Sequence, residues 1–203
     1  MREFLYYSRN APTTGNFGSD LMKAGRMDIA IHIVINSLFM SHAIRRETKL
    51  HLLFAGQPDP VKHIEIQAAE PKEHNQDERS DISKKDISGL IKRALYKYKK
   101  GQKVETMPGV TVEKKGFMEL VEELQESGRE IYILDKDGED IRTVKLGTHP
   151  VFVLGDQDGI PVKELRRLKK GFTPVSIGKT TYFASQTVSI VNNELDRREE
   201  SAE

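Results

Sequence analysis

"VFVLGDQDGIP", residues 151–161, passes from an unbroken apolar run into a turn of glycine, aspartate and glutamine. Two nearby segments share this pattern: EIYILD (130–135) ends in an acidic turn, and TPVSIG (173–178) ends at a glycine. Short apolar runs that end in turn residues are typical of buried strands. Between the last two strands, IPVKELRRLKKG (160–171) predicts a helix with proline near its start and glycine at its end.

The rest of the chain continues this alternation of strands and helices. The run 27–41 is rich in β-branched residues, but its length favours a buried helix over a strand. Gly101 and Gly128 are predicted to end two further helices. The remaining predicted elements are strands at 3–9, 49–56 and 61–68, helices at 86–101, 115–128 and 180–200, and a polar loop at 70–80. This alternation predicts an α/β fold with a mostly parallel sheet flanked by helices, whose ligands gather at the carboxyl ends of the strands.

Composition excludes several classes of protein. Lysine and arginine number 32 against 31 acidic residues, so the formal charge of +1 gives no overall sign of nucleic-acid binding, and any such surface must be local. The longest apolar stretch, 29–40, is too short to span a bilayer, so we expect no membrane partner. With no cysteine and no N-terminal signal pattern, we expect a cytoplasmic protein.

Three patterns for phosphate or metal binding fail. Gly178–Thr180 (GKT) looks like the end of a phosphate-binding loop, but the glycine needed five residues earlier is replaced by Thr173. The acidic run from Asp135 has Gly138 at its fourth position, whereas a calcium loop of the helix-loop-helix type needs glycine at its sixth. No pair among the six histidines stands at ligand spacing, so we expect no metal.

Four segments together carry a family resemblance. They are SRNAPTTGNF (8–17), the long run 24–56, VFVLGDQDGIP (151–161) and PVSIGKTTYFASQTVSIVNNELDR (174–197). With them the chain resembles the archaeal tRNA pseudouridine-54 N1-methyltransferases, which belong to the SPOUT superfamily, and the likeness runs nearly from end to end. The resemblance implies one SPOUT-type domain over 1–203, a C-terminal trefoil knot at about 130–200, and a homodimer. Periodicity cannot predict a knot, because chains do not ordinarily thread their own loops.

The resemblance also implies that S-adenosylmethionine is the methyl donor and is bound by the main chain of the knot loops. The positions carried over are Leu134, Gly155, Ser176, Ile177, Gly178 and Thr187. Thr187 stands where the family pattern has cysteine. Gly155 and Gly178 allow close approach of a ligand, although both would serve equally well as ordinary turn residues.

A short Arg-x-Asp element, Arg26 and Asp28, resembles one found in the related family that acts on small-subunit ribosomal RNA, where it lies beside the target nucleoside. The resemblance implies that Asp28 orients the uracil edge or accepts its proton, and that Arg26 holds a phosphate or a base carbonyl. The alternative is an Arg–Asp pair that caps the following helix. Together with Arg26, the neighbouring Arg45 and Arg46 are the predicted RNA contacts.

The sequence therefore predicts a methyltransferase that acts on N1 of pseudouridine 54 in tRNA. Two alternatives stay open at this stage. One keeps the chemistry but takes a pseudouridine of small-subunit ribosomal RNA as its substrate. The other is a non-catalytic dimer that binds RNA and has lost the methyl donor.

Overall fold

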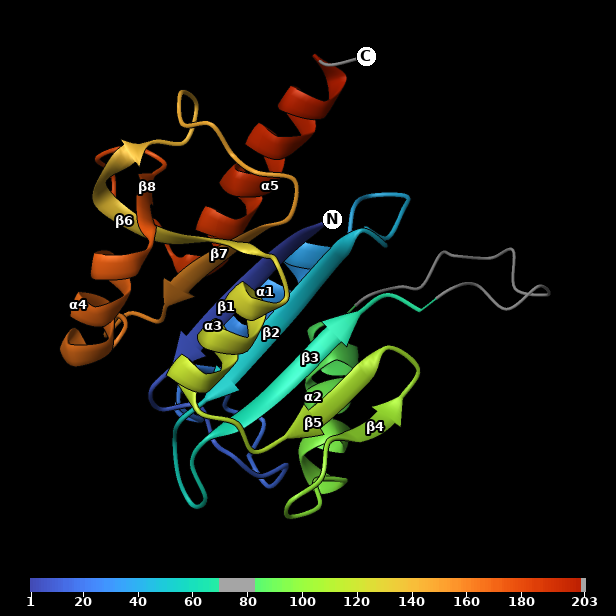
Figure 1. The fold of residues 1–203 in the computed structure, drawn as a ribbon. Coiled ribbons are helices and arrows are strands. Elements are labelled where there is room, and N and C mark those ends of the chain that lie inside the picture. The colour runs from blue at the N-terminus through green and yellow to red at the C-terminus, as the bar shows by residue number, and fades with distance from the viewer. Residues whose placement is uncertain (70–82, 202–203) are drawn as a thin grey trace.

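A computed structural model of the chain describes residues 1–69 and 83–201, so the predicted loop at 70–80 lies outside the described residues. Figure 1 shows one twisted sheet with helices in front of it and behind it. In chain order the elements are β1 (Arg2–Ser8), α1 (Met27–Leu38), β2 (Thr48–Phe54), β3 (Lys62–Gln67), α2 (Lys84–Tyr96), β4 (Val104–Met107), β5 (Val110–Glu113), α3 (Phe117–Glu126), β6 (Glu130–Asp140), β7 (Pro150–Gly155), α4 (Val162–Gly171), β8 (Thr173–Ser176) and α5 (Ala184–Glu200).

Within the described residues, eight strands form one sheet in the order β4-β5-β3-β2-β1-β7-β6-β8. The five strands from β2 to β8 run parallel, whereas β3, β5 and β4 extend the sheet as an antiparallel part. The predicted α/β fold with a mostly parallel sheet is confirmed. The carboxyl ends of β1, β7, β6 and β8 consequently meet at one edge.

Alternating side chains of the central strand β1 divide the core into two layers. Phe4 and Tyr6 pack with apolar residues of α1, α2 and α5, whereas Leu5 and Tyr7 pack with α3 and α4 on the opposite face. Both faces of the parallel part are therefore covered, and its strands read as continuous apolar runs rather than as alternating ones.

Helix α1 forms although its sequence is rich in β-branched residues, because burial against the sheet outweighs their weak helix propensity. Eight of its twelve residues are buried. The predicted helix is confirmed, and it ends at Leu38, three residues before the predicted end. Arg26, just before it, takes the left-handed conformation with φ 59° and ψ 40°, and Gly25 has φ 60°.

The structure also differs from the predicted elements in the ends of one helix and one strand and in one additional hairpin. Helix α2 ends at Tyr96 rather than at Gly101, while Gly128 follows the end of α3 with φ 84°, as predicted. Strand β6 continues past Asp135, where its pairing with β8 jumps from Leu134 to Glu139. The hairpin of β4 and β5 was not predicted. No helix in the described part of the chain is long and apolar enough to cross a membrane.

Candidate active site

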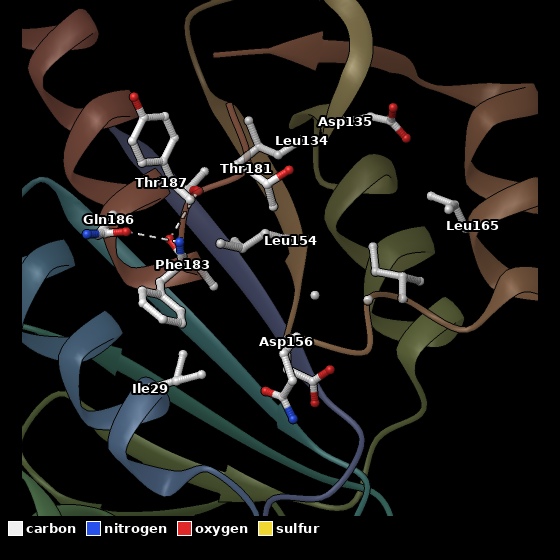
Figure 2. Close-up of a pocket in the computed structure, with 16 residues that line it drawn as sticks. Ile29, Leu134, Asp135, Leu154, Asp156, Leu165, Thr181, Phe183, Gln186 and Thr187 are labelled. Atoms are coloured by element: carbon white, nitrogen blue, oxygen red, sulfur yellow. Dashed lines mark hydrogen bonds between the residues drawn. The ribbon is translucent and has the colours of Figure 1, made fainter. Parts of the chain in front are cut away.

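A cavity of about 500 Å³ lies at the carboxyl edge of the sheet, where β6 and β7 end. It is enclosed by these strand ends, by the first part of α4 and by the start of α5, as Figure 2 shows. The apolar side chains that line it are Ile29, Leu134, Leu154, Ile160, Leu165 and Phe183. Its size and apolar character are those of a small-molecule site.

The floor of this cavity is the turn that follows β7. A Cβ atom on Gly155 would lie 2.6 Å from the carbonyl carbon of Gly159 and from the nitrogen of Ile160, so only glycine lets the chain fold back this tightly. Asp156 fixes the turn to the end of β1, because its carboxylate accepts hydrogen bonds from the Arg9 N–H at 2.7 Å and the Ser8 hydroxyl at 3.1 Å. The turn within 151–161 is therefore the floor of the pocket and is held in place by hydrogen bonds to β1.

A smaller hollow of about 140 Å³ adjoins the cavity and shares Leu134 and Thr187 with it. Ile177 and Gly178 line this second hollow, whereas Gly155 lines the first. The structure thus gathers five of the six residues predicted to bind the cofactor. Ser176, the sixth, lines neither hollow.

Ser176 instead fixes the loop after β8. Its hydroxyl accepts a hydrogen bond from the Gly178 N–H at 3.1 Å and lies 3.2 Å from the carbonyl oxygen of Lys136. Gly178 has φ 126°, a conformation that other residues rarely adopt. The Thr187 hydroxyl donates to the Phe183 carbonyl at 3.2 Å, so it is bound within α5.

The segment before α5 supplies lining residues that the sequence did not point to. Tyr182 and Phe183 line the cavity and keep 43% and 58% of their surface exposed. The Phe183 N–H donates to the Gln186 side chain at 3.0 Å, which caps the helix (Figure 2). Tyr182 and Phe183 are adjacent aromatic residues directly before the start of α5, and this pattern could have indicated a binding surface, because exposed aromatic residues often mark one.

Arg26 and Asp28 form a bidentate ion pair at the start of α1. Arg26 Nε lies 3.0 Å from Asp28 Oδ1, and Arg26 Nη2 lies 3.0 Å from Oδ2. The hydrogen bond from Arg26 lowers the pKa of Asp28 despite partial burial, and the same bond raises the pKa of Arg26. The Arg26 side chain makes no cap hydrogen bond with the described residues of the helix, and Ile29, which follows Asp28, lines the cavity. The pair is thus placed next to the cavity as well as at the helix start.

Tyr6 is a further polar residue near the cavity, and no sequence pattern pointed to it. Its hydroxyl is buried and has no hydrogen-bond partner among the described residues. Burial, and then the charge of Asp156, raise the pKa of Tyr6. In the sheet Tyr6 is the partner of Leu154, which lines the cavity. A neutral phenol therefore lies close to the site.

Arg45 and Arg46 lie beyond the other end of α1, about 18 Å along the helix from Arg26 at 1.5 Å per residue. Arg45 binds Asp196 of α5 with both of its terminal nitrogens, at 2.7 and 2.5 Å. Arg46 donates to the carbonyl of Ala69. The structure therefore does not bring the three predicted RNA contacts together.

Two histidines lie side by side in the structure, although no pair stands at ligand spacing along the chain. His51 and His63 are twelve positions apart in the chain, yet they lie on adjacent antiparallel strands with ring nitrogens 2.9 Å apart. Spacing along the chain could not show this contact, because strand register decides it.

Comparisons with known proteins agree with this geometry. Residues 1–200 match the model of the family described as "Putative SAM-dependent RNA methyltransferase". The chain belongs to this family. The resemblance stated from the sequence is thereby confirmed, and the donor that the family uses is S-adenosylmethionine.

Two relatives extend the match over whole chains. A protein of Methanococcoides burtonii is 36% identical over 97% of this chain and 96% of its own length, and one of Methanocella arvoryzae is 36% identical over 98% and 100%. Both are named tRNA (pseudouridine(54)-N(1))-methyltransferase. Nep1 of Archaeoglobus fulgidus, solved bound to S-adenosylhomocysteine, is similar in fold, with a TM-score of 0.58 and 15% identity over 97% of this chain and 96% of that one.

Proposed function

We propose that this chain transfers a methyl group from S-adenosylmethionine to N1 of pseudouridine 54 in tRNA. The observation that carries the proposal is the match of 36% identity with relatives of that name, which covers both chains nearly from end to end. The cavity at the strand ends supports it, because it lies where α/β sheets bind small molecules.

The residues around the two hollows fit this donor. S-adenosylmethionine supplies an electrophilic methyl carbon on its sulfonium sulfur. We assign Leu134, Gly155, Ile177 and Gly178 to hold it, since these strand ends offer main-chain groups beside apolar walls. Thr187 lines both hollows and so forms part of the wall of the donor site. Ser176 supports the donor site indirectly, because it fixes the Gly178 loop.

Asp28 is assigned to the acceptor. N1 of pseudouridine carries a hydrogen that must leave as the methyl group arrives, and a carboxylate can accept a hydrogen bond from that N–H. Because Arg26 lowers the pKa of Asp28, the carboxylate is a weak base at neutral pH, and its main role is to orient the ring. As the N1–C bond forms and the S–C bond breaks, S-adenosylhomocysteine leaves, and the proton of N1, which is now strongly acidic, passes through this carboxylate to solvent. Arg26 is assigned to hold a phosphate or a base carbonyl of the RNA.

The remaining assignments rest on the family. We propose a single SPOUT-type domain over 1–203, a trefoil knot within about 130–200, a homodimer and a cytoplasmic location. Arg45 and Arg46 are assigned to a second tRNA contact, separate from the one at Arg26. Such a separation suits an L-shaped RNA that is larger than this domain.

Methyl transfer to defined transcripts tests the proposed function. Transcripts of tRNA that carry pseudouridine or uridine at position 54 are compared, together with a fragment of small-subunit ribosomal RNA that contains pseudouridine. We expect a product only with the pseudouridine tRNA, because uridine has no free N–H at the corresponding ring position. A product only with the ribosomal fragment would show that the substrate is ribosomal RNA instead of tRNA.

A melting experiment distinguishes a protein that binds the methyl donor from a non-catalytic protein that binds only RNA. A ligand that binds only the folded state raises the melting temperature. We therefore expect a rise with S-adenosylmethionine in the absence of RNA. No rise at saturating donor, combined with tight tRNA binding, would favour the non-catalytic alternative.

A further inference from the structure

A buried polar cluster lies away from the candidate active site, on β2 and β3. His51, His63 and Glu65 each offer one donor atom, and these three atoms all lie within 4.8 Å of one another. His51 Nδ1 is 2.9 Å from His63 Nε2 and 3.9 Å from Glu65 Oε2. Both imidazoles are 1% exposed, and none of the three residues lines the two hollows described above.

The outer nitrogen of each imidazole is bound to a carboxylate. His51 Nε2 is 2.8 Å from Glu3 Oε2, and His63 Nδ1 is 3.0 Å from Glu113 Oε1. Glu3 also accepts from Arg129 at 2.9 Å, and Glu113 pairs with Lys115 at 3.0 Å. Carboxylates that are flanked by cations can only accept hydrogen bonds, so both outer nitrogens must be N–H donors.

This arrangement leaves two ring nitrogens that face each other with lone pairs. Two acceptors at 2.9 Å repel unless a cation lies between them. A proton shared by the two rings would use only these two nitrogens. The carboxylate oxygen of Glu65 points to the same gap and adds a third, anionic donor.

We propose that His51, His63 and Glu65 form a binding site for one divalent transition-metal ion, of which zinc is the best match. Zinc takes imidazole nitrogen and carboxylate oxygen at about 2.0–2.2 Å. Histidine ligands of metals usually donate their other N–H to a carboxylate, and both histidines do so here. Neighbouring donors of a tetrahedral ion are about 3.4 Å apart, so the two rings need to separate by only about half an ångström.

The surroundings determine how the ion enters and what it does. Glu65 keeps 21% of its side chain exposed and lies 3.8 Å from Lys49 and 3.4 Å from Lys103, so entry from solvent displaces two flexible lysine side chains. His51 belongs to the parallel part of the sheet, whereas His63 and Glu65 belong to the antiparallel part. The ion would therefore crosslink the parallel and antiparallel parts of the sheet, so its role would be structural.

Metal titration tests the site on the full chain, produced without a polyhistidine tag and stripped with a chelator. We expect one equivalent of Co²⁺ to bind and to give the visible absorption of a four-coordinate nitrogen and oxygen site. One equivalent of Zn²⁺ should displace the cobalt and raise the melting temperature. If no metal binds, the proposal is wrong and a shared proton holds the two rings.

Matched variants locate the binding. Glu65→Gln keeps the size of a partly exposed side chain, so the protein should fold, and its affinity for Co²⁺ should fall at least about 10- to 100-fold. Glu113→Gln should weaken binding about 10-fold through the outer hydrogen bond of His63. The control is the double variant His42→Gln/His149→Gln, which removes two exposed histidines and should bind like the wild type. Equal affinity of wild type and Glu65→Gln, or loss of binding in the control, would overturn the proposal.

Discussion

Two arginine–aspartate pairs stand at opposite ends of α1, and each joins its arginine to both oxygens of the aspartate. Arg26 and Asp28 are two positions apart and lie beside the cavity. Arg45 and Asp196 are 151 positions apart, and their pair ties α5 to the segment before β2. The same chemistry therefore occurs once as a local pair near a pocket and once as a long-range brace.

The difference lies in what surrounds each pair. Asp196 also binds Arg2, whose side chain is only 8% exposed, so its carboxylate is already committed to two arginines. Arg26 and Asp28 have no such third partner in the described residues, and the backbone at Arg26 is held in a left-handed conformation. A pair without a second arginine among the described residues, at the open edge of the sheet, can exchange contacts with a substrate, whereas the brace cannot do so without a loss of stability.

The largest expected effect is on catalysis, from Asp28→Asn. The amide keeps the size of the carboxylate but removes its charge, so N1–H of the acceptor loses its hydrogen-bond partner. We expect kcat for tRNA methylation to fall about 100-fold, measured in single-turnover assays. The rise in melting temperature with S-adenosylmethionine should stay unchanged.

Asp20→Asn is the matched control for Asp28→Asn. Asp20 is an exposed aspartate whose side-chain partners among the described residues lie in its own turn, at Lys23. The activity of this variant should therefore equal that of the wild type. An unchanged kcat in Asp28→Asn would remove Asp28 from the mechanism and would leave the pair as a feature of the helix start.

The next effect concerns the floor of the cavity. In Gly155→Ala the added Cβ would lie 2.6 Å from backbone atoms of Gly159 and Ile160, so the turn must shift. We expect affinity for S-adenosylmethionine to fall about 10-fold, or about 1.4 kcal/mol, measured by calorimetry. Gly171→Ala is the control, because nothing lies within 4 Å of a Cβ at that position. Equal affinity of the two variants would show that the turn does not shape the donor site.

The strands that end at the carboxyl edge of the sheet could be predicted from the sequence, for a physical reason. Three of the strands that end there contain a buried apolar run that stops at aspartate or glycine, at 130–135, 150–155 and 173–178. Such runs strongly favour a buried strand. Gly155 and Gly178 were found in this way, together with the family resemblance. Helix α1 was predicted from length alone, because its composition favoured a strand.

Features that depend on contacts distant along the chain could not be predicted. The brace between Arg45 and Asp196 and the contact of His51 with His63 arise from packing and strand register, which no local pattern encodes. The hairpin of β4 and β5 was missed because its strands have only four residues each. Its Pro108–Gly109 turn, with Gly109 at φ 75°, was the signal that could have found it.

Asp196→Asn tests the brace through stability. The change leaves Arg2 and Arg45 without their shared carboxylate, so we expect the free energy of unfolding to fall by about 2 kcal/mol, between the values for exposed and buried pairs. Urea denaturation measures it, while kcat of the folded fraction should be unchanged. Glu122→Gln, which breaks the exposed pair with Arg167, is the control and should cost less than about 1 kcal/mol.

The same variant has a predictable pH dependence. Burial raises the pKa of Asp196, but hydrogen bonds from Arg45 and Arg2 outweigh it, so the pKa in the folded protein lies below the ordinary 3.8. The stability that this carboxylate contributes is therefore fully present above about pH 4 and is lost as pH falls through the lower folded value. The stability difference between wild type and Asp196→Asn should shrink in that acidic window. A difference that stays constant from neutral pH to pH 2 would contradict an ionic brace.

The smallest effect is expected for the tRNA contact proposed at the far end of α1. Arg46→Gln removes one positive charge near the surface, so we expect tRNA affinity to fall about 3-fold. The slope of log affinity against log salt concentration should decrease by the amount expected for about one phosphate contact. Arg45→Gln should show the same change in salt dependence and, unlike Arg46→Gln, a lower melting temperature, because Arg45 also binds Asp196. If Arg45→Gln lowers the melting temperature but leaves the salt dependence unchanged, Arg45 is a brace alone. If Arg46→Gln leaves the salt dependence unchanged as well, the RNA contacts of this protein lie at the Arg26 end of the helix.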